Sequence, residues 1–113
     1  MVILTHPCAG KTYYAKQDFR VTDCPDINEK VDGEFVFVCP GHKYYDRYDA
    51  VVVLPLSQLE VNVGMRRKEN KKKLYTELAD IMKQREIVLR ISFERNLPIF
   101  ESIPDCMNYY QDK

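Results

Sequence analysis

Residues 1–14 read MVILTHPCAGKTYY, and this stretch decides the fold. Its first apolar run, Val2-Ile3-Leu4, has the composition of a short buried strand. The loop from Thr5 to Gly10 follows, and residues 11–17 have the pattern of the first turns of a helix. The chain therefore opens with a strand, a short loop and a helix, and the downstream segments are interpreted around this unit.

Apolar segments further along the chain predict strands at residues 19–22, 34–39, 50–54 and 99–100. The segments at 34–39 and 50–54 are almost continuously apolar, which is typical of strands covered on both faces of a parallel sheet. Apolar residues then recur at helical spacing from residue 70 and predict a long helix that ends before Pro98. We expect a minimal α/β fold with a parallel sheet and this long C-terminal helix.

Length and composition fit one soluble domain. The chain has 113 residues, with 17 basic and 17 acidic side chains, so its overall charge does not favour nucleic acid or membrane. It has no apolar run of the roughly 20 residues that span a bilayer and no signal-peptide pattern, so we expect a cytoplasmic protein. We assign residues 1–105 to the domain and residues 106–113 to a tail that is draped on the surface or used for interaction.

The loop at residues 5–12 has the chemistry of a phosphate-binding loop. Backbone amides at the start of a helix attract anions, so Cys8, Ala9, Gly10, Lys11 and Thr12 are the predicted nucleotide-binding residues. The Lys11 amine would neutralise the β and γ phosphates, and the Thr12 hydroxyl would help to hold Mg²⁺. The full motif begins with glycine, whereas this chain has Thr5. The alternative is an ordinary strand-to-helix turn with a solvated lysine.

Two aspartates follow the second predicted strand. Asp23 stands at the carboxyl edge of the sheet, where binding groups gather in parallel α/β proteins. A carboxylate there orients Mg²⁺ or accepts a proton from an attacking hydroxyl. The predicted metal site is therefore Thr12, Asp23 and Asp26. Alternatively, both aspartates only stabilise the turn around Pro25.

A basic run, RRKENKKK, occupies residues 66–73. A solvated helix face is the commonest use of such a run. The second interpretation is a lid, hinged at Gly64, that brings Arg66 or Arg67 onto the phosphoryl group being transferred. The third is a nucleic-acid patch, although aromatic residues for stacking are absent from the run itself.

Histidines, cysteines and tyrosines offer two further possibilities. His6, Cys8, Cys39 and His42 supply nitrogen and sulfur ligands for zinc, but only the last two have the usual ligand spacing. Without an export signal, the cysteines are expected to be free thiols. Tyrosines 44, 45 and 48 offer rings to stack on a base, although packing is the commoner fate of such residues.

Taken in order, the first strand, "CAGKT", "FRVTD" with a second Asp three residues on, "FVFVCPGHK", "YDAVVVLP" and "RRK" resemble small P-loop kinases. These enzymes phosphorylate nucleosides, nucleotides or polynucleotide ends, and many are phage-encoded. The likeness covers roughly residues 1–100, and "GKT" is its specific part. It implies ATP and Mg²⁺ as cofactors, a nucleoside or nucleic-acid hydroxyl as acceptor, and catalytic roles for Lys11, Asp23, Arg66 and Arg67.

Two functions remain open at this point. The first is a minimal kinase in which Asp23 prepares an acceptor hydroxyl for attack on the γ phosphate of ATP. The second is a reduced, non-catalytic P-loop scaffold that serves as an interaction or structural subunit through its tyrosine-rich surface. The missing first glycine and the few residues available for a crossover between Asp26 and Phe35 favour the scaffold. The retained Lys11, Thr12 and Asp23 favour the enzyme.

Overall fold

The computed structural model describes residues 1–24, 26–69 and 78–111, and it does not describe the side chains of residues 66–69. The chain begins with a strand, a helix and three further strands, and it ends with two helices, a short strand and a last helix. In order they are β1 Val2–Thr5, α1 Lys11–Gln17, β2 Val21–Cys24, β3 Phe35–Val38, β4 Ala50–Val52, α2 Leu56–Glu69, α3 Leu78–Arg95, β5 Ile99–Phe100 and α4 Ile103–Gln111.

The strands form one five-stranded sheet in the order β2-β3-β1-β4-β5, and all its pairings are parallel. The predicted α/β class and parallel sheet are therefore confirmed. β1 lies at the centre, where Ile3 pairs with Phe37 of β3 on one side and with Ala50 of β4 on the other. All residues of β3 and β4 are buried, as their continuous apolar sequences predict.

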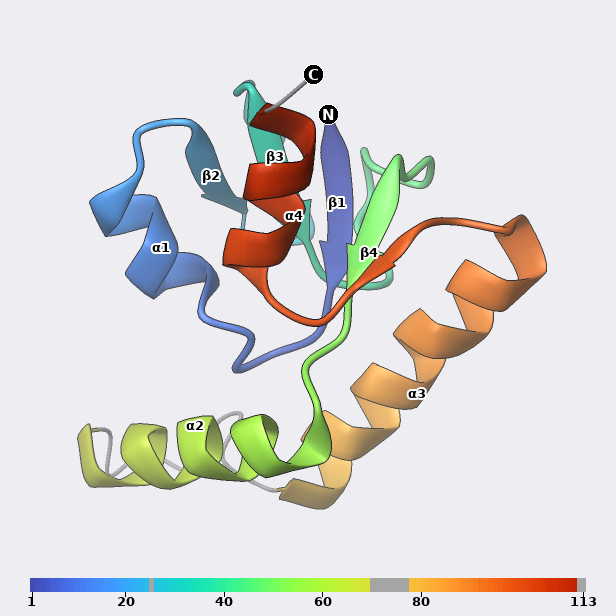
Figure 1. The fold of residues 1–113 in the computed structure, drawn as a ribbon. Coiled ribbons are helices and arrows are strands. Elements are labelled where there is room, and N and C mark those ends of the chain that lie inside the picture. The colour runs from blue at the N-terminus through green and yellow to red at the C-terminus, as the bar shows by residue number, and fades with distance from the viewer. Residues whose placement is uncertain (25, 70–77, 112–113) are drawn as a thin grey trace.

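Helices α1 and α4 cover one face of the sheet, which faces the viewer in Figure 1. Alternate strand residues point to this side because successive side chains of a strand face opposite ways. Ile103, Cys106 and Met107 of α4 are fully or almost fully buried in this layer. Residues 106–111 are therefore part of a core helix, and the expectation of a surface tail that begins at residue 106 is wrong. A single turn of apolar side chains was too short a pattern to reveal this helix.

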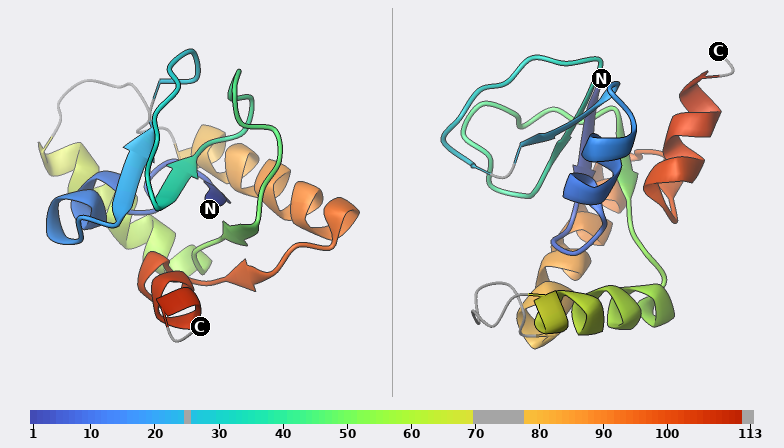
Figure 2. Two further views of the ribbon diagram at one scale, coloured as in Figure 1. Left: turned by 90° about the horizontal axis from the view of Figure 1, so that it is seen from above. Right: turned by 90° about the vertical axis from the view of Figure 1, so that its left-hand side faces the viewer.

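The opposite face is covered by α3 together with two long loops, residues 26–34 and 39–49 (Figure 2). Val88 of α3 is fully buried against this face, and Val31, Tyr45 and Tyr48 of the loops pack beside it. Neither loop contains a helix in its described residues. The β2–β3 connection is thus as short as the sequence predicts, and it lacks the helix that usually joins parallel strands.

Helix α2 lies across the carboxyl ends of the strands and packs against the start of α3 (Figure 1). It was not predicted, because apolar residues lie on both its buried and its exposed sides and give no clear helical stripe. Gly64 lies inside this helix, so the predicted hinge at this residue is wrong. The long helix predicted from residue 70 is described from Leu78 and ends at Arg95, close to the predicted end; residues 70–77 lie outside the description.

Candidate phosphate-binding site

The loop between β1 and α1 is tightly curled. Cys8 and Gly10 both have left-handed backbone angles, with φ of 63° and 94°. A left-handed conformation is uncommon for a residue other than glycine, so Cys8 marks a segment held in place by its surroundings. Left-handed residues that alternate with right-handed ones turn successive N–H groups toward one concave side and create an anion-binding nest. The segment before Lys11 thus has left-handed angles on both sides of Ala9, which is the kind of backbone that forms such a nest.

Three neighbours hold this loop. The Thr5 hydroxyl donates to the backbone carbonyl of Val52 at 2.9 Å, so Thr5 completes β1 and its side chain bonds the neighbouring strand. The Asn62 amide of α2 donates to the Cys8 carbonyl, also at 2.9 Å. The Cys8 side chain packs on the α2–α3 cluster that contains Leu59. Thr5 therefore serves the sheet, and the curled segment begins after it.

His6 is a structural link between two strand ends. Its ring is fully buried; Nδ1 donates to the Pro7 carbonyl at 2.8 Å, and Nε2 accepts the Leu54 N–H at 3.1 Å. Burial is the main reason that the pKa of His6 is lowered to about 4; the bond to the Pro7 carbonyl opposes this change, and the charges of Lys11 and Arg85 add to it. The imidazole is therefore neutral at pH 7, and protonation of Nε2 would break its bond to Leu54.

The Lys11 amine reaches across the carboxyl end of the sheet to β3. Its Nζ donates to the sulfur of Cys39, which follows β3 directly, at 2.8 Å. β3 is the neighbour of β1, so this bond lies beside the curled loop. The partner of the amine is a thiol, and no bond between Lys11 and a carboxylate is seen in the described residues. A thiol is a weak acceptor that a phosphate oxygen readily replaces.

Thr12 and Asp23 form the second polar pair of the site. The Thr12 hydroxyl donates to Asp23 Oδ2 at 2.8 Å, which joins α1 to the end of β2. The other carboxylate oxygen, Oδ1, is buried and has no hydrogen-bond partner among the described residues. A buried carboxylate oxygen is costly unless a hydrogen-bond donor or a cation accompanies it. A hydroxyl and a carboxylate fit Mg²⁺, which takes few protein ligands and completes its shell with water and phosphate oxygens.

Asp26 differs from Asp23. It is exposed, and its Oδ1 accepts the Asn28 N–H at 2.9 Å in the turn after β2. The turn interpretation therefore applies to Asp26 alone, because Asp23 contacts Thr12. A role for Asp26 in metal binding stays a prediction. The described residues contain no group of three or more His, Cys, Asp or Glu side chains that is able to hold a metal ion.

Arg66 and Arg67 lie near the end of α2, and their side chains are outside the described part of the chain. A third arginine was missed in the sequence. Arg85 of α3 donates through Nε to the Leu54 carbonyl at 2.9 Å, while His6 binds the N–H of the same residue. This bond places a guanidinium group next to the carboxyl end of β4. The sequence carries no signal for it, because Arg85 is one of many charges on a helix.

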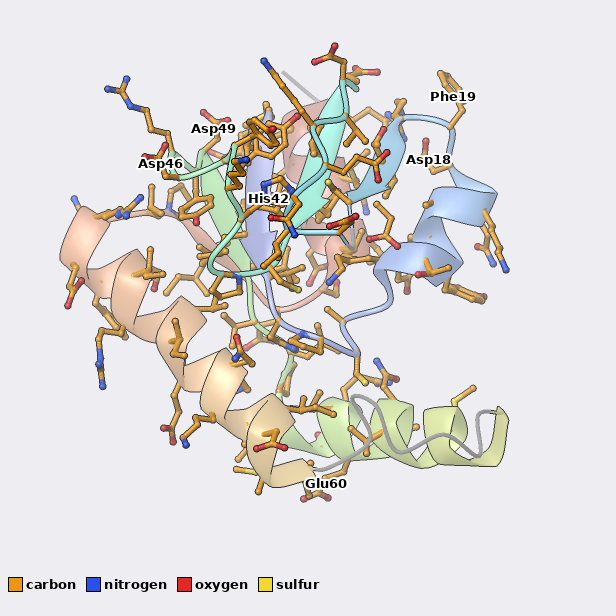
Figure 3. The ribbon with its side chains drawn as sticks, turned by 180° about the vertical axis from the view of Figure 1, so that it is seen from behind. Asp18, Phe19, His42, Asp46, Asp49 and Glu60 are labelled. Carbon is orange, nitrogen blue, oxygen red and sulfur yellow. The ribbon has the colours of Figure 1, made fainter. Side chains whose placement is uncertain are left out.

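The predicted zinc ligands have other partners. His42 accepts the Tyr44 N–H through Nδ1 at 3.1 Å, so its Nε2 carries the proton that faces Cys24 Sγ at 3.2 Å. Burial raises the pKa of the Cys24 thiol, and the imidazole offers it no free acceptor nitrogen, so this pair is not a nucleophile with its base. His42 lies over the loop-covered face of the sheet (Figure 3). The zinc alternative is not supported, since His6 and His42 use both ring nitrogens elsewhere.

The tyrosines divide between packing and exposure. In each of the three Tyr-Tyr pairs, the second ring packs against a core cluster while the first is about half exposed; the packed rings are those of Tyr14, Tyr45 and Tyr110. The Tyr45 ring also packs at a tilt against His42, with ring centroids 4.9 Å apart, and Tyr48 lies under Arg95. Of the three tyrosines considered for base stacking, only Tyr44 is about half exposed. Among the described residues, the exposed tyrosines lie on different elements: Tyr13 on α1, Tyr44 in the loop after β3 and Tyr109 on α4.

Comparison with protein-family models, with curated proteins and with solved structures finds no match to this chain. Within the described ranges, no helix is both long and apolar enough to cross a membrane. The case for function therefore depends on the geometry of the loop and of its polar neighbours.

Proposed function

We propose that this chain binds a nucleoside triphosphate with Mg²⁺ through residues 8–12 and transfers its γ-phosphoryl group to a hydroxyl of a nucleoside, nucleotide or polynucleotide. The observation that carries the proposal is the curled loop, with left-handed Cys8 and Gly10 between a buried central strand and Lys11. A left-handed residue other than glycine is costly and persists only where its surroundings hold it in place. Phosphate binding accounts for this strain, because such a backbone forms an anion-binding nest.

Each group of residues has a distinct role in this proposal. Amides 8–12 and the Lys11 amine bind phosphate oxygens, and Lys11 leaves the Cys39 thiol when it does so. Thr12 and Asp23 hold Mg²⁺, which when bound neutralises charge on the phosphates. The bond between Thr12 and Asp23 Oδ2 favours this role for Asp23 over that of proton acceptor. Arg85, together with Arg66 and Arg67 of α2, is a candidate to stabilise the transferring group.

One observation favours the non-catalytic scaffold as a second candidate. The connections at residues 26–34 and 39–49 are without helices in the described chain, so the elements that would grip an acceptor are much reduced. In that case the loop binds nucleotide, or an equivalent anion, without onward transfer. Binding and transfer must therefore be measured separately.

Thermal denaturation with and without Mg-ATP tests binding. A ligand at 100 times its dissociation constant adds about 2.7 kcal/mol, which for a domain of this size raises Tm by roughly 10 °C or more. We expect Lys11→Ala to abolish the shift and Lys16→Ala, which removes an exposed lysine of the same helix, to preserve it. An unchanged Tm of the wild type with Mg-ATP would refute the proposal.

Asp23→Asn and Asp26→Asn form a second matched pair. We expect Asp23→Asn to remove the part of the Tm shift that depends on Mg²⁺, and Asp26→Asn to retain it. Transfer of label from γ-labelled ATP to nucleosides and oligonucleotides then separates the two candidates. Binding without any transfer would leave the scaffold as the function.

A further inference from the structure

The turn between α1 and β2 displays an aromatic side chain to solvent. Phe19 is 94% exposed, more than any other large hydrophobic residue among those described. Figure 3 shows its ring pointing away from the body of the protein. The turn lies at the opposite end of the sheet from the curled loop (Figure 1). Its role is therefore separate from that of the phosphate site.

The turn is braced from both sides of Phe19. Asp18 and Arg20 form a two-point ion pair, with Arg20 Nη2 2.6 Å from Asp18 Oδ2 and Nε 3.0 Å from Oδ1. Asp18 Oδ1 also accepts the Arg20 N–H, and the Asp18 carbonyl accepts the Val21 N–H, both at 3.0 Å. Phe19 is thus held outward on an ordered turn. Pre-ordering of this kind lowers the entropic cost of using an aromatic residue as a binding anchor.

A hollow of about 290 Å³ lies directly beside this turn, between α1 and α4. Its apolar lining includes Val21, Ile103 and Met107, while Asp18, Arg20, Gln17 and Asn108 contribute polar groups. The hollow is large enough for a phenyl ring, but the adjacent Phe19 points away from the protein.

We infer that this face is a two-fold interface between copies of the chain, in which Phe19 of each copy enters the hollow of the other. A two-fold interface uses the same patch twice, so a protruding anchor and its receptor must lie side by side on one surface. Phe19 is flanked in sequence by residues that line the hollow, which meets this requirement.

Charge also favours a second copy as the occupant. Among the described residues, the charged side chains that line the hollow are Asp18 and Arg20, and they neutralise each other, so these groups of two copies do not repel. In a two-fold arrangement, each acid is also able to approach the base of the partner. A strongly basic or acidic partner, such as nucleic acid, finds no net charge here to bind.

Sedimentation velocity over a wide concentration series tests the inference. We expect the wild type to pass from monomer to dimer as its concentration rises. Phe19→Ser removes both anchors; at tenfold or more for each, it should raise the dimer dissociation constant by roughly 100-fold. Phe93→Ser is the matched control, because Phe93 is 75% exposed on α3 and away from the hollow, and it should not change the constant.

Asn108→Trp, at an exposed position of α4, fills the hollow and should weaken self-association like Phe19→Ser. The two variants are complementary, since one keeps its hollow and the other keeps its Phe19. Mixed together, they should form a heterodimer with one of the two contacts, at a concentration where neither variant alone associates.

Circular dichroism establishes that each variant is folded before it is compared. A wild type that stays monomeric at all concentrations would overturn the inference. So would a Phe93→Ser effect equal to that of Phe19→Ser, or a mixture of the complementary variants that does not associate.

Discussion

The two ends of the sheet leave different groups without partners. At the carboxyl end the loop is curled, and within the described part of the chain Lys11 bonds a thiol while a buried oxygen of Asp23 has no hydrogen-bond partner. At the amino end Asp18 and Arg20 satisfy each other, and the Asp49 carboxylate accepts the Val2 N–H, yet Phe19 is almost fully exposed. One end lacks polar partners and the other lacks apolar cover.

This difference indicates two kinds of ligand. Unsatisfied polar groups around a concave loop call for a small anion and its cation, because only hydrogen bonds and charge compensate a buried polar atom. An exposed aromatic ring on a braced turn calls for an apolar surface, which only a macromolecule offers at this size. The two ends can therefore be tested independently, from the largest expected effect to the smallest.

The largest effect is expected in α4, which lies along the sheet face between the two ends (Figure 1). Ile103→Ala removes a side chain that is 1% exposed and packs in the core cluster. We expect the free energy of unfolding to fall by about 2–5 kcal/mol, measured by urea denaturation. A fall below about 0.5 kcal/mol would mean that α4 is not part of the core between the two ends of the sheet.

The next effect concerns pH and the carboxyl end. Burial lowers the pKa of His6 to about 4 from its ordinary value of 6.5, so between these values the unfolded chain binds a proton that the folded chain does not. Stability therefore falls as the pH drops below 6.5 and levels off near 4, with a total loss of about 3 kcal/mol.

Urea denaturation at several pH values measures this loss. His6→Gln is the matched variant, because its amide oxygen is able to accept the Leu54 N–H and does not titrate in this range. It should remove most of the pH dependence between 6.5 and 4. An equally steep dependence in the variant would assign the effect to other groups.

Much of the architecture could be predicted from the sequence, whereas the partners of the site residues could not. Continuous apolar runs located β3, β4 and the parallel sheet, because burial on both faces demands such runs. The second strand was predicted two residues early, since Phe19 looks like a strand residue and the Asp18–Arg20 pair that turns it outward is a contact between side chains. The sequence likewise identified Lys11, Thr12 and Asp23 as candidates. It did not predict that Cys39 bonds Lys11 or that Arg85 bonds Leu54, because these contacts arise only through the fold.

Alanine substitutions at two glycines distinguish a loss of stability from a loss of Mg-ATP binding. Gly10 and Gly41 both have left-handed angles, with φ of 94° and 86°. Alanine should cost about 1–2 kcal/mol at each position because its Cβ disfavours this conformation. At Gly10 the added Cβ would also lie 3.1 Å from the Tyr14 ring, whereas at Gly41 it meets nothing within 4 Å.

We therefore expect Gly10→Ala to be the less stable of the two and to lose the Mg-ATP shift, which Gly41→Ala should keep. Paired urea and thermal measurements provide both values. Equal Mg-ATP shifts in the two variants would mean that the curl at Gly10 does not serve phosphate binding.

Asp23→Val tests whether the Asp23 carboxylate lowers the stability of the ligand-free protein while it is needed to bind Mg-ATP. The substitution removes the buried oxygen without a partner, suits a strand, and leaves the exposed Thr12 hydroxyl to bond water. We expect the ligand-free protein to gain about 1 kcal/mol and to lose its response to Mg-ATP. Asp26→Val should instead lose some stability, because it removes the acceptor of the Asn28 N–H. A loss of stability in Asp23→Val would show that the carboxylate is structural.

The smallest effect is expected for Phe19→Ser at the amino end. Because the ring is 94% exposed, its removal takes away almost no contact within one copy of the chain. The free energy of unfolding, measured at a concentration where the protein is monomeric, should change by no more than about 0.5 kcal/mol. The same variant should nevertheless show the large loss of self-association, since its apolar surface is used only between copies. A clear destabilisation of the monomer would mean that Phe19 packs within its own chain, and the contrast between the two ends would then fail.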